Sequence, residues 1–156
     1  MATKPRQIIS DEMVDKIISE PKYADGRASW TPKIRKNSSN MEVTVPLRCK
    51  YPCSVIVRAH IRRKTSFSVI LMYGKQIVIR YNGYHSDHTN MLERDKIRGP
   101  HIHKLTERYQ EATDRPDGFA VQTDKFSDLS GAIRSFQKDM NIEITSEKNS
   151  LDAWLG

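Results

Sequence analysis

His101 and His103 are separated by one residue and follow directly on Gly99 and Pro100. Proline has no amide proton and disfavours helical geometry in the residue before it, so we expect an extended segment here. Alternate side chains of a strand point to the same face, which would place both imidazoles on one surface. Two such imidazoles can act as an acid and base pair or as two metal ligands. The competing interpretation is a pair of surface or partly buried histidines without a chemical role.

Metal-independent cleavage of RNA requires few groups. One group removes the proton of the 2′-hydroxyl, a second protonates the leaving 5′-oxygen, and a cation stabilises the charged phosphorane. His101, His103 and Arg80 are residues of the required types. The sequence therefore indicates a catalytic set of His101, His103 and Arg80, with no metal and no cofactor.

A metal site is an open alternative, because four histidines lie between residues 85 and 103. It would use two or three of these histidines together with Asp87 or Asp95. The histidines are His85, His88, His101 and His103. Their spacing matches no standard metal motif, and the chain has neither a phosphate-binding loop nor a dinucleotide glycine signature.

The net charge of +7 is concentrated in the N-terminal part of the chain. Residues 1–64 hold 14 Lys and Arg against 6 Asp and Glu, whereas residues 65–156 hold 12 against 13. Basic clusters attract the phosphate backbone of nucleic acids through counterion release. The predicted nucleic-acid-binding residues are Lys33, Arg35, Lys36, Arg58, Arg62, Arg63 and Lys64. Charges of this kind also serve simply as a solvated surface.

The apolar pattern predicts a helix, an antiparallel sheet and a closing helix. Ser10, followed by acidic residues, predicts the N-cap of a helix over 11–20. Apolar and polar residues alternate between 41 and 82, which predicts an antiparallel meander with turns at 64–65 and 74–75. A short strand is expected at 119–121. The apolar stripe of residues 129–140, capped by Ser127, predicts a helix that covers the sheet.

The expected fold class is therefore α+β: an antiparallel β-meander covered on one face by a C-terminal amphipathic helix, with an additional N-terminal helix. We divide the chain into an N-terminal helix (1–21), a basic linker or loop (22–40), an α+β core domain (41–144) and a tail (145–156). Residues 107–118 are polar and predict a loop. No apolar run approaches the ~20 residues that span a bilayer, so we expect a soluble, cytoplasmic protein without a membrane partner.

The order of these features resembles the small TumE-type toxins of bacterial toxin–antitoxin systems and related uncharacterised bacterial or phage domains. Those proteins place an Arg-Tyr-Asp/Asn strand end before a His-x-His motif and finish with an apolar helix. The matching features here, within residues 53–144, are Ile79-Arg80-Tyr81-Asn82, Gly99-Pro100-His101-Ile102-His103, Phe119-Ala120-Val121 and the helix Leu129 to Ile142. This chain has Asn82 where Asp is common, and long inserts at 83–98 and 104–117.

The resemblance implies a toxin with ribonuclease activity and an antitoxin as its protein partner. Our leading interpretation is a protein that acts on nucleic acid, RNA rather than DNA, with a TumE-like cleavage site. The main alternative is a phage or mobile-element protein without catalysis, which binds nucleic acid or a host defence protein through its basic surface. The third interpretation is a metal-dependent enzyme that uses the histidine-rich segment.

Overall fold

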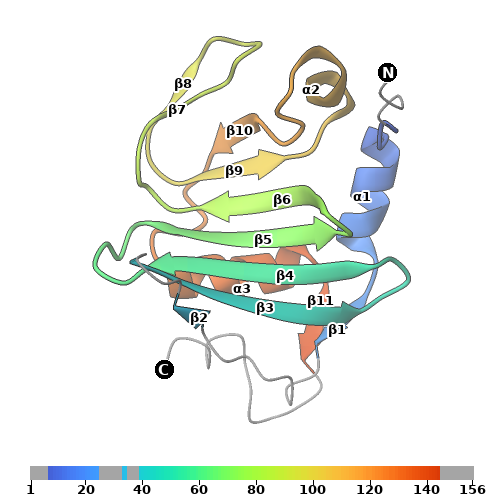
Figure 1. The fold of residues 1–156 in the computed structure, drawn as a ribbon, viewed down its shortest axis with the longest axis horizontal. Coiled ribbons are helices and arrows are strands. Elements are labelled where there is room, and N and C mark those ends of the chain that lie inside the picture. Colours follow the sequence, from blue (N-terminus) through green and yellow to red (C-terminus); the bar gives the residue numbers. More distant parts are fainter. Residues whose placement is uncertain (1–6, 25–32, 35–38, 145–156) are drawn as a thin grey trace.

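The computed structural model describes residues 7–24, 33–34 and 39–144 (Figure 1). The first helix, α1 (Asp11–Ser19), begins where the sequence predicts it. Ser10 is its N-cap, and the Ser10 Oγ accepts a hydrogen bond from the backbone N of Met13 at 3.0 Å. Val14 and Ile17 on this helix are buried in the hydrophobic core. The apolar stripe of α1 is therefore a packing face.

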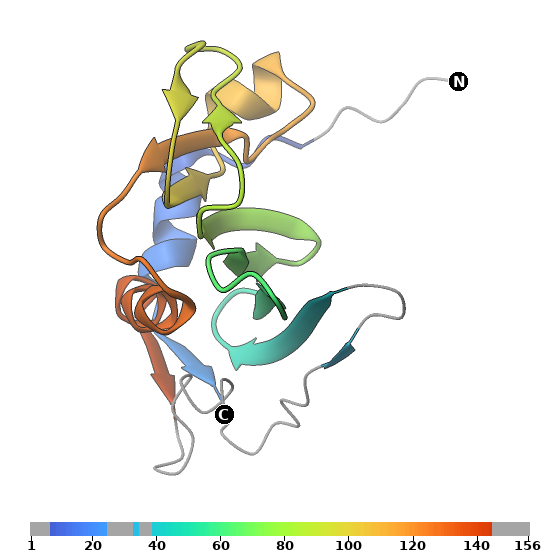
Figure 2. The ribbon, with the colours of Figure 1, turned by 90° about the vertical axis from the view of Figure 1, so that its left-hand side faces the viewer.

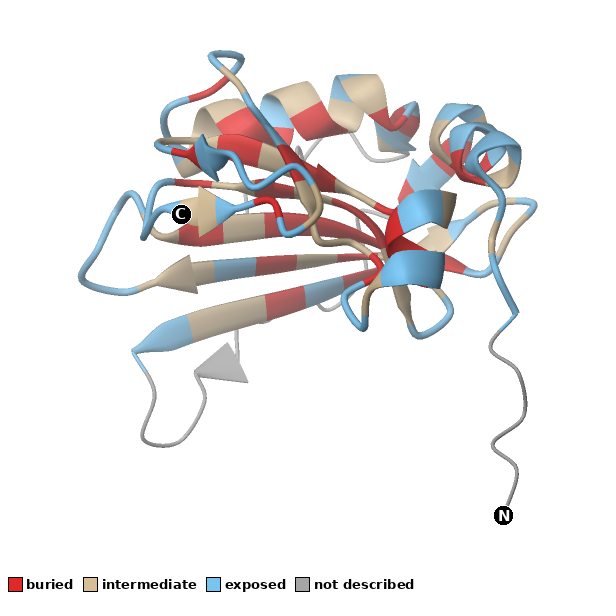
Figure 3. Ribbon diagram, turned by 90° about the horizontal axis from the view of Figure 1, so that it is seen from above, coloured by how far each residue is buried: buried red, intermediate tan, exposed pale blue. Residues whose placement is uncertain are grey.

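Four antiparallel strands form the predicted meander. They are β3 (Asn40–Arg48), β4 (Cys53–His60), β5 (Phe67–Tyr73) and β6 (Gln76–Asn82). Gly74 in the turn between β5 and β6 has a φ of 56°, a left-handed conformation that favours glycine. Buried and more exposed positions alternate along much of this sheet, as Figure 3 shows. The prediction of a meander from the two-residue period is confirmed.

Further strands extend the meander on both sides. On one side lie β9 (His101–Lys104) and β10 (Phe119–Gln122), so the predicted strands at 101–103 and 119–121 are confirmed. On the other side lie β1 (Lys22–Ala24), its parallel partner β11 (Ile142–Ile144), and β2 (Lys33–Ile34), which pairs with β3. Lys22–Ala24 was expected to open a linker. It is a strand instead, because β1 pairs with both β3 and β11.

Two short strands form a separate hairpin near the β9 and β10 side of the sheet. They are β7 (His88–Thr89) and β8 (Lys96–Ile97), which pair only with each other in the described part of the chain (Figure 1). Sequence reasoning did not anticipate this hairpin, since each strand is too short to show a period. It brings residues 83–98 next to the sheet.

Helix α3 (Leu129–Asp139) covers one face of the sheet, and Figures 1 and 2 place α1 on the same side. Ala132, Ile133 and Phe136 on α3 are buried in the core. The N-cap is Asp128 and not Ser127, because the Asp128 carboxylate accepts a hydrogen bond from the backbone N of Gly131 at 2.7 Å. The α+β fold class is confirmed.

The segment 107–118 contains a helix, which corrects the expected loop. Helix α2 (Glu107–Ala112) begins at Thr106, whose hydroxyl accepts a hydrogen bond from the backbone N of Tyr109. Tyr109 and Gln110 are buried, which anchors this short helix on the rest of the protein. None of the helices in the described residues is long and apolar enough to cross a membrane.

Candidate functional site

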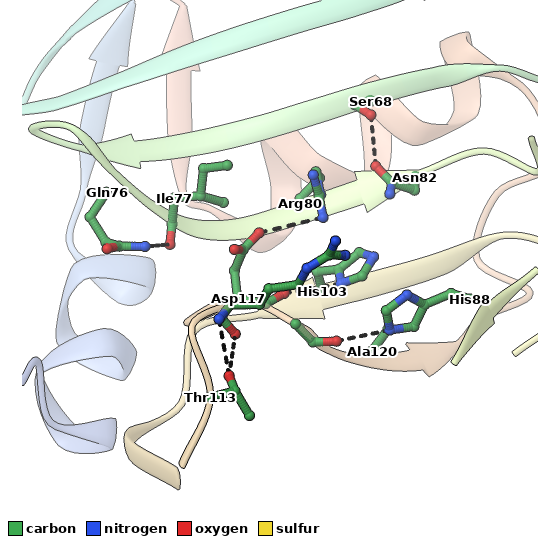
Figure 4. A network of polar contacts seen from close by, with 12 residues as sticks. Ser68, Gln76, Ile77, Arg80, Asn82, His88, His103, Thr113, Asp117 and Ala120 are labelled. Carbon is green, nitrogen blue, oxygen red and sulfur yellow. Dashed lines mark hydrogen bonds and ion pairs between the residues drawn. The ribbon is translucent and has the colours of Figure 1, made fainter. Parts of the chain in front are cut away.

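The pairing of β6 with β9 brings the predicted catalytic residues together. Arg80 lies opposite His103, and Asn82 lies opposite His101 in the register of these strands. Tyr81 between them is buried against Phe136 of α3. Because neighbouring strand residues point to opposite faces, Arg80 and Asn82 point away from α3. His101 and His103 share that face, on which Figure 4 shows Arg80, His103 and Asp117 close together.

A cavity of about 730 Å³ lies on this face of the sheet. Strands β4, β5, β6 and β9 contribute to its lining, together with the segments 83–88 and 115–118. All five histidines of the chain line it, namely His60, His85, His88, His101 and His103. The sequence pairs only two of these histidines in a motif. The tertiary structure gathers the other three around the same space.

Three of the imidazoles are in direct contact. The ring centroid of His88 lies 4.5 Å from that of His103 and 5.6 Å from that of His101, and the latter two are 4.9 Å apart. The hairpin of β7 and β8 supplies His88. From the sequence, His88 is a candidate metal ligand and not a member of the predicted catalytic set. The one signal in the sequence is the local density of histidine.

The hydrogen bonds of the His-x-His pair assign the ring protons. His101 Nδ1 lies 2.9 Å from the carbonyl oxygen of Gly99, and His103 Nδ1 lies 3.0 Å from that of Asp117. A carbonyl oxygen can only accept, so Nδ1 carries the proton in each neutral ring. The lone pair therefore lies on Nε2 of both imidazoles, where it can accept a proton.

The environment keeps both rings of the pair neutral. Burial lowers the pKa of His101, and His88 and Arg80 add to this effect, while the hydrogen bond with Gly99 opposes it. Burial is also the largest cause for His103, and with the charges of Arg80, His88 and His101 it lowers the pKa of His103 to about 3. At neutral pH neither ring is an imidazolium. Any general acid in the cavity would have to be another group.

Arg80 forms an ion pair with Asp117, and its Nη2 lies 3.4 Å from the Asp117 Oδ2. Arg80 Nε and Asp117 Oδ2 are both buried, yet neither has a hydrogen-bond partner among the described residues. Burial lowers the pKa of Arg80, Asp117 opposes this, and the nearby charges of Arg58 and Arg115 lower it further. Three guanidinium groups thus interact across one cavity. Such a cluster favours a bound anion.

The predicted nucleic-acid-binding residues fall into two groups. Arg58 lines the cavity, where its Nε donates to Glu42 at 2.8 Å, and the exposed residues Arg62, Arg63 and Lys64 form the turn between β4 and β5. The backbone N atoms of Arg62 and Arg63 donate to Nδ1 of His60, which also lines the cavity. This basic turn, residues 62–64, therefore borders the cavity.

Of the remaining predicted binding residues, the structure describes only the backbone of Lys33. The backbone of Lys33 lies in β2, opposite Glu42 of β3. Arg35 and Lys36 lie outside the described residues.

The two carboxylates considered for a metal site do not both lie at the cavity. Asp87 lines the cavity, but its carboxylate lies 3.7 Å from the guanidinium of Arg98, and Asp95 is not part of the lining. Among the described residues, no group of three or more His, Cys, Asp or Glu side chains is arranged to hold a metal ion.

Comparisons with models of protein families, with curated proteins and with solved structures find no match to this chain. The resemblance to TumE-type toxins therefore stays a prediction, and the function has to be argued from the site itself.

Proposed function

We propose that this protein binds RNA on its basic face and cleaves a phosphodiester in the cavity without a metal ion. The observation that carries the proposal is the convergence of Arg80, His101 and His103 on one cavity that also holds two further arginines. The basic turn at the rim offers a path for the neighbouring phosphates. The expected cytoplasmic location suits a protein that acts on RNA.

His101 is the base in this mechanism. Its Nε2 keeps a lone pair because Nδ1 is held by the carbonyl oxygen of Gly99. A base with a pKa of about 3, such as His103, is weak, which leaves His101 as the better acceptor of the 2′-hydroxyl proton. His103 contacts the His101 ring and helps to hold it in position.

Arg80 stabilises the charge that develops on the phosphorane, and Arg58 and Arg115 bind the same phosphate or its neighbours. The 2′-oxygen attacks phosphorus, the bond to the 5′-oxygen breaks, and the products are a 2′,3′-cyclic phosphate and a 5′-hydroxyl. This chemistry requires the internal 2′-hydroxyl, which is why RNA and not DNA is the proposed substrate.

Cleavage of an RNA of mixed sequence tests the proposal. We expect cleavage that persists in chelator, produces 2′,3′-cyclic phosphate ends and spares the 2′-deoxy analogue. His101→Ala should lower the rate about a hundredfold or more with little change in RNA affinity. The matched control is Gln122→Ala, an exposed residue opposite His101 in β10. RNA that stays intact, or loss of activity on metal removal, would contradict the proposal.

The second candidate function is binding without catalysis. Two observations favour it: His101 and His103 are only 4% and 3% exposed, and the basic turn is exposed beside the cavity. The partner would be nucleic acid, a host defence protein or, if the chain is a toxin, an antitoxin. Salt-dependent RNA binding without cleavage by the parent protein would support this function over the first.

A further inference from the structure

His88 is held in the cavity by a buried polar network. Its Nε2 lies 2.8 Å from the carbonyl oxygen of Gly118 and 3.1 Å from the Oδ1 of Asn90. Asn90 is 1% exposed and is itself fixed, since its amide donates to the carbonyl oxygen of Ala120 and accepts from the backbone N of that residue, both at 2.8 Å. The position of His88 is thus set by a residue of its own hairpin and by Gly118, which lies 30 residues further along the chain.

Both acceptors face Nε2, so Nε2 carries a proton in the neutral ring of His88. The second nitrogen, Nδ1, makes no hydrogen bond with any of the described residues. When both ring nitrogens carry a proton, Nε2 keeps its own proton and donates it in the hydrogen bond to the carbonyl oxygen of Gly118. The proton on Nδ1 is then the one available for transfer.

The proposed cleavage needs a proton donor that the His-x-His pair does not supply. An alkoxide is a poor leaving group, and its departure from phosphorus is slow unless the 5′-oxygen is protonated. Among the five histidines that line the cavity, His88 is the one in ring contact with both His101 and His103. It is therefore within reach of the scissile phosphate if His101 is.

We propose that His88 is the general acid of this site, which protonates the leaving 5′-oxygen. This inference rests on the proposed function. As the 2′-oxygen bonds to phosphorus, its proton passes to Nε2 of His101, the P–O5′ bond breaks, and the proton on Nδ1 of His88 passes to the 5′-oxygen. Exchange with water afterwards restores both rings, so protons and electrons balance over one turnover.

The charged and titratable groups around His88 come from several elements. His101 and His103 face it from β9, Arg80 acts on the same pair from β6, and Asp117 precedes the Gly118 carbonyl that holds it. On its own hairpin, Asp87 pairs with Arg98.

The test uses two RNA substrates that differ in one atom. The first is the ordinary RNA, and the second carries a bridging sulfur in place of the 5′-oxygen at the mapped cleavage site. A thiolate leaves without being protonated. We expect the His88→Gln variant to cleave the ordinary RNA about a hundredfold or more slowly than the parent protein does. The same variant should cleave the sulfur substrate at close to the parent rate. His101→Ala should slow the cleavage of both.

Glutamine retains a donor near the position of Nε2 but cannot act as a proton donor at neutral pH, and His88→Asn is a second variant if His88→Gln fails to fold. Thr89→Ala, at the exposed neighbouring position on the same hairpin, is the matched control. Folding is checked by circular dichroism and thermal unfolding.

Three results would overturn the inference. If His88→Gln slows the cleavage of both substrates equally, His88 is a structural residue. If the cleavage of both substrates is unchanged, His88 takes no part in the reaction. A full equivalent of bound zinc in the parent protein that is lost in His88→Gln would make it a metal ligand. If the parent protein cleaves neither RNA, the proposed function itself fails.

Discussion

At the scale of single residues, His103 shows how the fold changes what a side chain can do. The sequence predicts an imidazole that titrates near neutrality, but His103 is 3% exposed and in contact with two other imidazoles. Its Nδ1 donates to the carbonyl oxygen of Asp117, which compensates part of the cost of burying a polar ring. The ring is therefore kept neutral, and the acid and base pair expected from the sequence lacks its acid.

This burial predicts a pH dependence of stability. An ordinary histidine has a pKa of about 6.5, whereas that of folded His103 is about 3. Between these values the unfolded chain binds a proton that the folded chain does not, so the free energy of unfolding should fall as the pH is lowered from about 6.5 towards 3. The effect is of the order of 1.4 kcal/mol for each pKa unit.

Urea unfolding between pH 4 and pH 7 measures this effect, and nuclear magnetic resonance of the His103 ring gives its protonation directly. His103→Asn should remove that part of the slope, while His85→Asn, at an exposed position, should retain it. A His103 ring that titrates near pH 6 in the folded protein would show that the interpretation is wrong.

At the scale of elements, hydrogen bonds from side chains to backbone atoms connect helices and strands that are not paired in the sheet. Asn90 of the hairpin satisfies both backbone groups of Ala120 on β10, as a neighbouring strand would. Lys22 in β1 joins two helix ends, because its Nζ donates to the carbonyl oxygens of Ile18, Glu20 and Met140, each at 2.8 Å. These carbonyl groups lie at the C-terminal ends of α1 and α3. The last carbonyl oxygens of a helix have no hydrogen-bond donor within the helix itself.

We predict that Lys22→Met lowers the free energy of unfolding by about 3 kcal/mol or more. Lys22 is fully buried, and each hydrogen bond from a charged donor contributes about 1.5–3 kcal/mol. Lys16→Met is the control, because Lys16 is exposed and its ion pair with Glu12 lies on the helix surface, so the change should stay within about 0.5 kcal/mol. Urea unfolding compares the two variants, and equal losses would contradict the assigned role of Lys22.

At the scale of the whole molecule, the meander separates two sets of basic turns. The basic turn between β4 and β5 lies at one end of these strands, beside the cavity. The turns that contain Lys50 and Lys75 lie at the other end, since successive antiparallel strands reverse direction. The proposed RNA path therefore depends on where the basic residues lie, and not on the amount of charge alone.

This arrangement predicts the salt dependence of RNA binding. Replacing Arg62 and Arg63 by Gln should reduce the slope of log affinity against log salt by about 0.7 for each phosphate that the variant no longer neutralises. The matched double variant replaces Lys50 and Lys75 by Gln, removes the same charge and should leave the slope nearly unchanged. Fluorescence anisotropy with a labelled RNA at several salt concentrations measures both. Equal effects would mean that net charge alone attracts RNA.

The sequence by itself determined the elements whose pattern is local. The alternation over residues 41–82 specified the meander, Ser10 specified the start of α1, and Pro100 indicated the extended His-x-His segment. These signals are readable because a period of two residues, or a cap beside its helix, involves neighbours in the chain. The alignment of Arg80 with His103 comes instead from the pairing of β6 with β9, which no local pattern shows.

Only the tertiary structure decided the rest of the site. His88 reaches His101 and His103 through a hairpin too short to have a period, and Lys22 meets Met140 across 118 residues of sequence. The neutral state of the imidazole pair depends on burial and on the charge of Arg80, which no spacing encodes. Burial and long-range contact are properties of the packed chain, and for that reason the residue types were visible in the sequence while their protonation and their convergence were not.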